Sequence, residues 1–177
     1  MRSTRWLLLL LTIAAVLSCA RPSLDESPRT SFFIASEGPG NGAALGGLAG
    51  ADAHCQLLAQ RAGVGGTWRA YLSTQAPGGQ PAVNARDRIG SGPWYNANGV
   101  LIARTVAELH SETANLTKEA SIDEGGQMVN GRGDTPNRHD ILTGSQQDGT
   151  ALPGTDDTTC SNWTSSGEGS AQVGHHD

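Results

Sequence analysis

Four side chains in the C-terminal third carry oxygen atoms that could bind a metal ion or another ligand. They are Asp148, Asp156, Asp157 and Asn162, in a tract rich in Gly, Asp, Asn and Thr. Calcium takes six to eight such oxygen ligands from flexible loops, so the four form a candidate calcium-binding or ligand-binding site. Asp and Asn also shape turns, because their side chains bond the nearby backbone. The sequence leaves both interpretations open, with calcium as a possible cofactor.

Other residue types that carry chemistry are scattered along the chain. Of the five histidines, only His175 and His176 are adjacent, and they are followed by Asp177. Neighbours on an extended chain point to opposite sides, so these residues predict no confident metal centre. The chain has no Gly-x-Ser-x-Gly elbow, phosphate loop or His-Glu-x-x-His motif. We therefore predict a protein that is not an enzyme and has no catalytic residues.

The N-terminus carries the pattern of an export signal. Arg2 and Arg5 precede an apolar run over residues 6–17, which ends at Ser18-Cys19. The run is short for a permanent membrane span and favours a cleaved signal peptide. Its end resembles a bacterial lipobox, so we predict a lipoprotein signal over residues 1–18 and lipid attachment at Cys19. An ordinary signal peptide with a chance cysteine is the alternative.

The lipid would anchor the protein to a bacterial envelope membrane, at the outer membrane or the cell surface. Residues 19–30 mix Pro, Ser and charge and predict a flexible tether. Removing the signal lowers Lys+Arg from 12 to 10 against 17 Asp+Glu, so the net charge moves from −5 to −7. An acidic domain argues against nucleic acid as a partner.

Two cysteines remain after Cys19 is assigned to lipid. Cys55 and Cys160 would lie in an oxidising compartment, where a disulfide is permitted. We expect both to be structural cysteines. Whether they pair with each other stays open at this stage.

The remainder of the chain predicts one loop-rich α+β domain over residues 31–177. Residues 31–36 are aromatic and β-branched and predict a strand. A helix is expected from position 51 or 52, with an apolar stripe of Cys55, Leu58, Ala59 and Ala62 and a C-terminal Gly63. Alternation over residues 68–72 predicts a half-buried strand, with Trp68 in the core.

Shorter elements are expected further along. Asn98-Gly99 between apolar runs predicts a hairpin of residues 93–96 and 99–103. Residues 83–89 could form a helical turn or a strand, and so could residues 105–110. Residues 141–143 are an apolar island and predict a short strand.

Several ordered blocks of sequence resemble the endostatin domain of certain collagens, a member of the C-type-lectin-like fold. The blocks are Gly50-Ala51-Asp52, Cys55, Gly66-Thr67, Arg69-Ala70, Leu72-Ser73, Thr143-Gly144-Ser145, and Cys160 with Trp163-Thr164. The resemblance covers roughly residues 31–175. It implies a C-type-lectin-like α+β fold of the kind also found in bacterial lipoproteins.

Departures from the family limit what the resemblance implies. By the family pattern, the cysteine partners of Cys55 and Cys160 would follow Asp177, so the domain is expected to lack its last strand or to keep free thiols. A missing strand would expose a neighbouring sheet edge. The family's N-terminal zinc histidines and heparin-binding arginines have no counterpart here, and neither does the Glu-Pro-Asn or Gln-Pro-Asp sugar tripeptide of C-type lectins.

The sequence therefore predicts an envelope-anchored lipoprotein with a non-catalytic, lectin-like domain that binds carbohydrate or protein. The alternative is a structural or assembly lipoprotein whose incomplete sheet a partner strand completes.

Overall fold

The computed structural model describes residues 29–76 and 81–177. The predicted signal peptide, Cys19 and most of the tether lie outside the described residues. Within them, no helix has the length and apolar character needed to cross a membrane.

The longest element is α1 (Gly47–Arg61), which begins earlier than the sequence predicts. Glycines at its start have low helix propensity, but the backbone packs so closely there that a Cβ on Gly50 would collide with the carbonyl of Leu45. Asp52 consequently lies inside the helix instead of at its N-terminus. Leu58 and Ala59 are buried and Cys55 is half-buried as expected, whereas Ala62 is the exposed C-cap. Gly63 has the predicted left-handed conformation, with φ 73°.

The remaining elements are short. They are η2 (Ala85–Asp87), β1 (Trp94–Tyr95), β2 (Leu101–Ala103), α2 (Val106–Leu109), β3 (Asp140–Leu142), α3 (Cys160–Trp163) and β4 (Val173–His175). β1 pairs with β2 in an antiparallel hairpin, as Asn98-Gly99 predicts. β3 pairs antiparallel with β4, with Asp140 opposite His175. The mixture of helices and small antiparallel sheets is compatible with the predicted α+β class.

Two predicted strands are wrong as paired elements. Residues 31–36 and 68–72 lie outside every strand, and neither segment forms a ladder with another described segment. The alternating pattern of residues 68–72 reflects burial alone: Ala70 and Leu72 are buried, and Trp68 is half-buried beside Phe33, with the ring centroids 4.6 Å apart. Side-chain burial does not by itself supply a partner strand.

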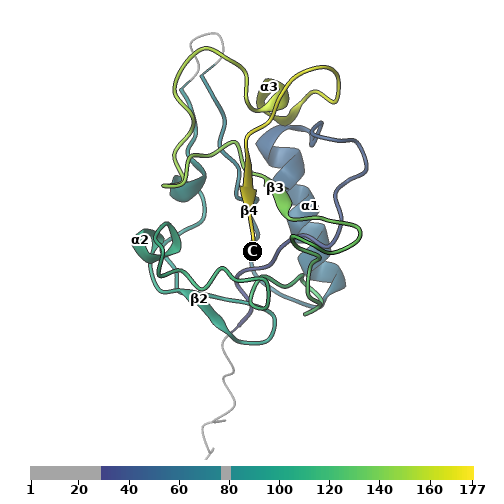
Figure 1. Ribbon diagram of the computed structural model, residues 1–177, viewed down its shortest axis with the longest axis vertical. Coiled ribbons are helices and arrows are strands. Elements are labelled where there is room, and N and C mark those ends of the chain that lie inside the picture. Colours follow the sequence, from purple (N-terminus) through teal and green to yellow (C-terminus); the bar gives the residue numbers. More distant parts are fainter. Residues whose placement is uncertain (1–28, 77–80) are drawn as a thin grey trace, which may run out of the picture.

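The hydrophobic core is divided into two clusters. The first contains Ala51, Ala70, Leu72 and Trp163, and the second contains Trp94, Ile102, Ala103 and Ala120. Figure 1 shows α1 on one side of β4 and α2 with β2 on the other, while the chain ends near the centre of the view. Members of both clusters face the same central space.

Candidate functional site

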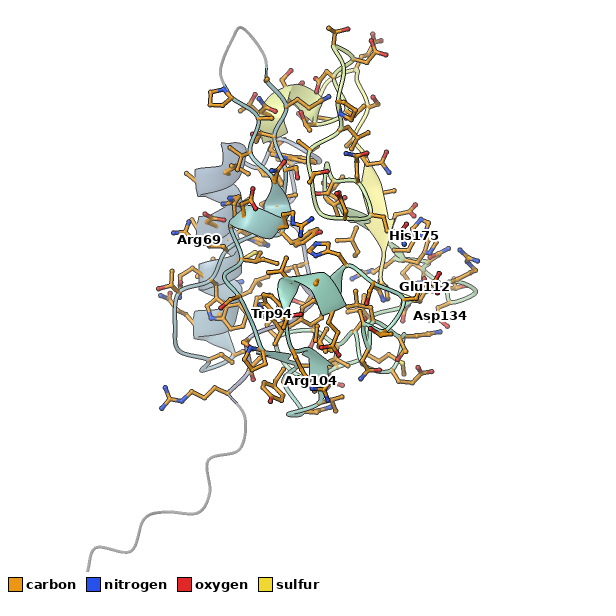
Figure 2. The ribbon with its side chains drawn as sticks, turned by 90° about the vertical axis from the view of Figure 1, so that its left-hand side faces the viewer. Arg69, Trp94, Arg104, Glu112, Asp134 and His175 are labelled. Atoms are coloured by element: carbon orange, nitrogen blue, oxygen red, sulfur yellow. The ribbon has the colours of Figure 1, made fainter. Side chains whose placement is uncertain are left out.

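A central cleft of about 1390 Å³ lies between the two core clusters. Interior voids in folded domains seldom exceed the size of a water molecule, and ordinary ligand pockets occupy roughly 300–1,000 Å³. The lining is largely apolar and includes Phe32, Phe33, Leu45, Trp68, Leu72, Trp94, Leu109, Leu116, Leu142 and Val173. In Figure 2, Arg69 and His175, both lining residues, lie on opposite sides of the molecule. The cleft is therefore the principal candidate for a binding site.

One wall of the central cleft is segment 67–72, and its backbone groups are of two kinds. The segment includes a tight turn, in which the amide of Leu72 donates to the carbonyl of Ala70 at 3.0 Å. The amide of Trp68 donates to Gln56 Oε1 at 3.0 Å and that of Ala70 donates to Asp52 Oδ1 at 2.9 Å, so side chains of α1 engage these two amides. By contrast, the N–H and C=O groups of Arg69 and Tyr71 have no hydrogen-bond partner among the described residues. These groups are available to bond a neighbouring chain.

Segment 31–35 repeats this arrangement on another part of the lining. The amides of Phe32 and Ile34 donate to the carbonyls of Tyr95 and Ile122, at 3.0 and 2.9 Å. The backbone groups of Phe33 and Ala35, which alternate with them, find no partner within the described part of the chain. Two sets of unpaired backbone groups thus line one apolar space.

Segment 67–72 and β3 lie close together at their C-terminal ends. The amide of Ser73 donates to the carbonyl of Thr143 at 2.8 Å, and Leu142 packs against the core cluster that contains Leu72. Residues of both segments also line the central cleft.

Tyr71 also joins the cleft wall to α2. His110 Nδ1 lies 2.7 Å from the carbonyl of Val106, so this nitrogen carries the proton, and Nε2 accepts from the Tyr71 hydroxyl at 2.7 Å. Burial, opposed by nearby Arg86, raises the pKa of Tyr71 to about 12. The phenol stays protonated at neutral pH, so the pair positions the wall and offers no activated nucleophile.

The two cysteines are both free thiols, so the disulfide that the compartment permits is not formed between them. Cys55 lines the central cleft, where burial and, to a smaller extent, the charge of Asp52 raise its pKa to about 11. A thiol with that pKa is a poor nucleophile and metal ligand at neutral pH. Cys160 instead lies in the turn α3, where its Sγ is 3.4 Å from the carbonyl of Ser170.

The structure brings together two of the four predicted oxygen ligands: Asp157 Oδ1 and Asn162 Oδ1 lie 2.9 and 3.0 Å from the same hydroxyl, that of Thr159. Among residues 29–76 and 81–177, the carboxylates of Asp148, Asp156 and Asp157 form no group within 4.8 Å of one another. Asp148 accepts from the hydroxyl and amide of Thr150, at 2.6 and 3.0 Å, and these bonds lower its pKa. Its carboxylate therefore holds a local turn, as the alternative interpretation predicts.

The side chains of Asp157 and Asn162 also form hydrogen bonds with nearby backbone groups. Burial opposes ionisation of Asp157, but bonds from the amides of Thr159 and Ser161, at 2.9 and 2.6 Å, lower its pKa overall. Asn162 Oδ1 accepts from the amide of Gln75 at 2.9 Å, while its Nδ2 donates to the carbonyl of Gln75 at 3.2 Å. Asp156 is exposed and contributes its carbonyl to Gln75 Nε2 at 2.8 Å.

These contacts support an unusual backbone in α3. Its four residues all have positive φ, from 47° to 67°, a left-handed turn that costs about 1–2 kcal/mol per residue. Trp163 anchors the turn: it is fully buried, and its Nε1 donates to the carbonyl of Ser73 at 2.8 Å. The tract thereby attaches to the chain beside the cleft wall.

A histidine cluster that sequence spacing does not reveal lies at β3 and β4. Asp140 Oδ1 is 3.0 Å from His139 Nε2 and 3.1 Å from His175 Nε2. Positions 140 and 175 are brought together only by strand pairing, so no local motif signals them. As predicted for neighbours on an extended chain, His175 is exposed and His176 is buried.

His176 is a buried histidine with one ring nitrogen that lacks a hydrogen-bond partner among the described residues. Its side chain is 2% exposed and lines the central cleft, and its Nδ1 has no hydrogen-bond partner among the described residues. Its Nε2 lies 3.3 Å from the carbonyl of Asn130. A molecule bound in the central cleft could form a hydrogen bond with this unpaired nitrogen.

Comparisons with known proteins add no relative: a scan of protein-family models finds no match, and a search of curated proteins finds no similar sequence.

Proposed function

We propose that this protein is an envelope-anchored lipoprotein whose C-type-lectin-like domain binds, without catalysis, an extended polypeptide strand in its central cleft. The observation that carries the proposal is the two sets of unpaired backbone groups, at Arg69 and Tyr71 and at Phe33 and Ala35, on the lining of one apolar space. Strand addition satisfies such groups with main-chain hydrogen bonds, and apolar walls accept alternate side chains.

A polypeptide suits this lining better than a carbohydrate does. Sugars present many hydroxyls and require polar partners, whereas the walls of the cleft are formed largely by apolar side chains, among them Phe33, Trp68 and Leu72. The calcium-dependent alternative requires oxygen ligands that converge, and Asp157 and Asn162 are already engaged by the backbone. The function thus combines a binding role with the predicted completion of an incomplete sheet.

Residue-resolved hydrogen exchange can test the mode of binding. The probe is a library of extended peptides of about eight residues with alternating apolar side chains. Bound peptide should slow exchange at the amides of Arg69 and Tyr71 by about tenfold or more. The amides of Trp68 and Ala70, which α1 already bonds, should change less.

The matched control uses the same peptides with N-methyl groups on alternate amides, which remove donors from one edge of the strand. Binding that survives methylation of either edge, or protection confined to α1, would contradict strand addition. A glycan array with and without calcium tests the competing ligand class. Saturable glycan binding that leaves Arg69 and Tyr71 exchange unchanged would favour carbohydrate.

The anchor is tested separately, because Cys19 lies outside the described residues. Radiolabelled palmitate should label the protein in its bacterial host, and Cys19→Ala should abolish the label. Labelling that persists in the variant would refute lipid attachment at this cysteine without affecting the proposal for the cleft.

A further inference from the structure

Three potential metal ligands converge where β3 and β4 pair. The Nε2 atoms of His139 and His175 both approach Asp140 Oδ1, at 3.0 and 3.1 Å. The two imidazole rings are stacked, with centroids 4.1 Å apart and an interplanar angle of 19°. All three donor atoms lie within 4.8 Å of one another. Ligands on a tetrahedral zinc ion are about 3.3 Å apart, so the distances suit such an ion, although the two imidazole rings must rotate out of their stack to direct both Nε2 lone pairs at it.

A carboxylate behind the cluster orients one of the rings. His139 Nδ1 lies 3.0 Å from Asp177 Oδ1, and the backbone amide of Arg132 donates to the other oxygen of Asp177. A carboxylate only accepts, so Nδ1 of His139 carries the proton in this bond. Carboxylate–histidine pairs of this kind orient metal-binding imidazoles in proteins.

Among the described residues, the only basic side chains within ion-pair distance of the Asp140 carboxylate are His139 and His175. No lysine or arginine of this part of the chain occupies the space between the three donor atoms, so a divalent cation can take that place.

We propose that His139, Asp140 and His175 bind a divalent transition-metal ion of the zinc class. Two imidazoles and one carboxylate suit such an ion and leave a coordination position for water or a ligand. The ligands at positions 140 and 175 stand opposite each other in the β3–β4 ladder, so the backbone fixes their separation. Both residues also line the central cleft, which puts the ion at its margin. The proposal does not depend on peptide binding in the cleft.

Equilibrium dialysis of the untagged full-length protein against ZnCl₂ tests the site, after EDTA treatment and buffer exchange. We expect one Zn²⁺ per chain with a dissociation constant of about 1 μM or tighter. His139→Gln and His175→Gln should each weaken binding by about tenfold or more. His54→Gln is the matched control, because His54 lies on α1 and bonds the carbonyl of Glu37, and it should bind zinc as the wild type does.

Asp140→Asn should leave folding intact, since the Asp140 side chain is 61% exposed. It should also weaken zinc binding, while near-ultraviolet circular dichroism checks that each variant is folded. The absorption spectrum of bound Co²⁺ gives a second readout and should show tetrahedral coordination only when both histidines are present. Absence of zinc uptake, or an equal loss of affinity in His54→Gln, would overturn the proposal.

Discussion

Arg88 forms an ion pair with Asp52, in which Nη2 donates to both carboxylate oxygens, at 2.8 and 2.7 Å. Its Nη1 donates to the carbonyl of Ala70 at 2.6 Å, and Asp52 accepts from the amide of the same residue. The pair therefore attaches segment 67–72 to α1 and leaves the backbone groups of Arg69 and Tyr71 unpaired on the lining of the central cleft. The proposed binding of a peptide strand there depends on this interaction.

Arg88→Ala should lower the free energy of unfolding by about 2–4 kcal/mol, because it leaves the largely buried Asp52 with only Arg69, which is 53% exposed and 3.4 Å away, as a charged partner. The side chains of Arg88 and Asp52 are only 10% and 21% exposed. Urea denaturation followed by circular dichroism measures the change.

Arg104→Ala is the matched control for this variant. Arg104 also pairs with a carboxylate, that of Glu108, but it is 69% exposed, so its loss should cost about 0.5 kcal/mol or less. Similar losses for the two arginine variants would show that Arg88 has no special structural role.

Gly144→Ala should destabilise the domain more than Gly133→Ala does. Gly144 has φ 59°, and an added Cβ would lie 2.6 Å from the buried ring of Trp163. Gly133 also has positive φ, 84°, but has open space around it. Gly133→Ala should therefore cost only the conformational penalty of about 1 kcal/mol, and Gly144→Ala should cost about 1–3 kcal/mol more.

Thermal unfolding of the two glycine variants in parallel measures this difference. Equal melting temperatures would mean that the chain beside Trp163 can move aside, and that the left-handed turn is not rigidly anchored there.

Cys55 should make stability fall at high pH. Burial raises its pKa from 9.0 to about 11, so between these values the unfolded chain loses a proton that the folded chain retains. The contribution is fully present below pH 9 and is lost as the pH rises through 11, a change of about 2–3 kcal/mol. Cys55→Ala should flatten the stability curve in this window. Urea unfolding at a series of pH values compares the slopes, and an unchanged slope in the variant would contradict the assignment.

Asn162→Ala should lower stability by about 1–3 kcal/mol, because it leaves the buried backbone of Gln75 without its two hydrogen bonds. The control is Asn41→Ala, since Asn41 is exposed and its side chain makes no hydrogen bond to any described residue.

Melting temperatures recorded with and without calcium test whether the tract that contains Asn162 binds calcium. A calcium-dependent rise that Asn162→Ala abolishes would assign a ligand role to this residue.

Local elements were predictable because their signals lie within a few residues. The apolar stripe with Leu58 predicts α1, Asn98-Gly99 predicts the hairpin, and the helical turn considered for residues 105–110 is α2, capped by Thr105. The start of α1 was not predictable, because close packing against Leu45 overrides the low propensity of its glycines.

The candidate sites were harder to predict than the elements. The three aspartates of the tract form no cluster among the described residues, since neighbours in a loop can turn their side chains toward different backbone groups, while Asp157 and Asn162 meet at the hydroxyl of Thr159. The histidine cluster is the opposite case: its members are far apart along the chain and become neighbours through the β3–β4 ladder.

The amino-acid sequence by itself determined where the chain would be helical, where it would turn, and which extended segments would be half-buried. Period, capping and turn chemistry act between residues close in sequence, so they can be read without coordinates. Only the tertiary structure decided that residues 31–35 and 68–72 stay unpaired around one cleft, and that His139, Asp140 and His175 meet. Those outcomes depend on which distant segments approach each other, and hydrophobic patterning specifies burial without specifying a partner.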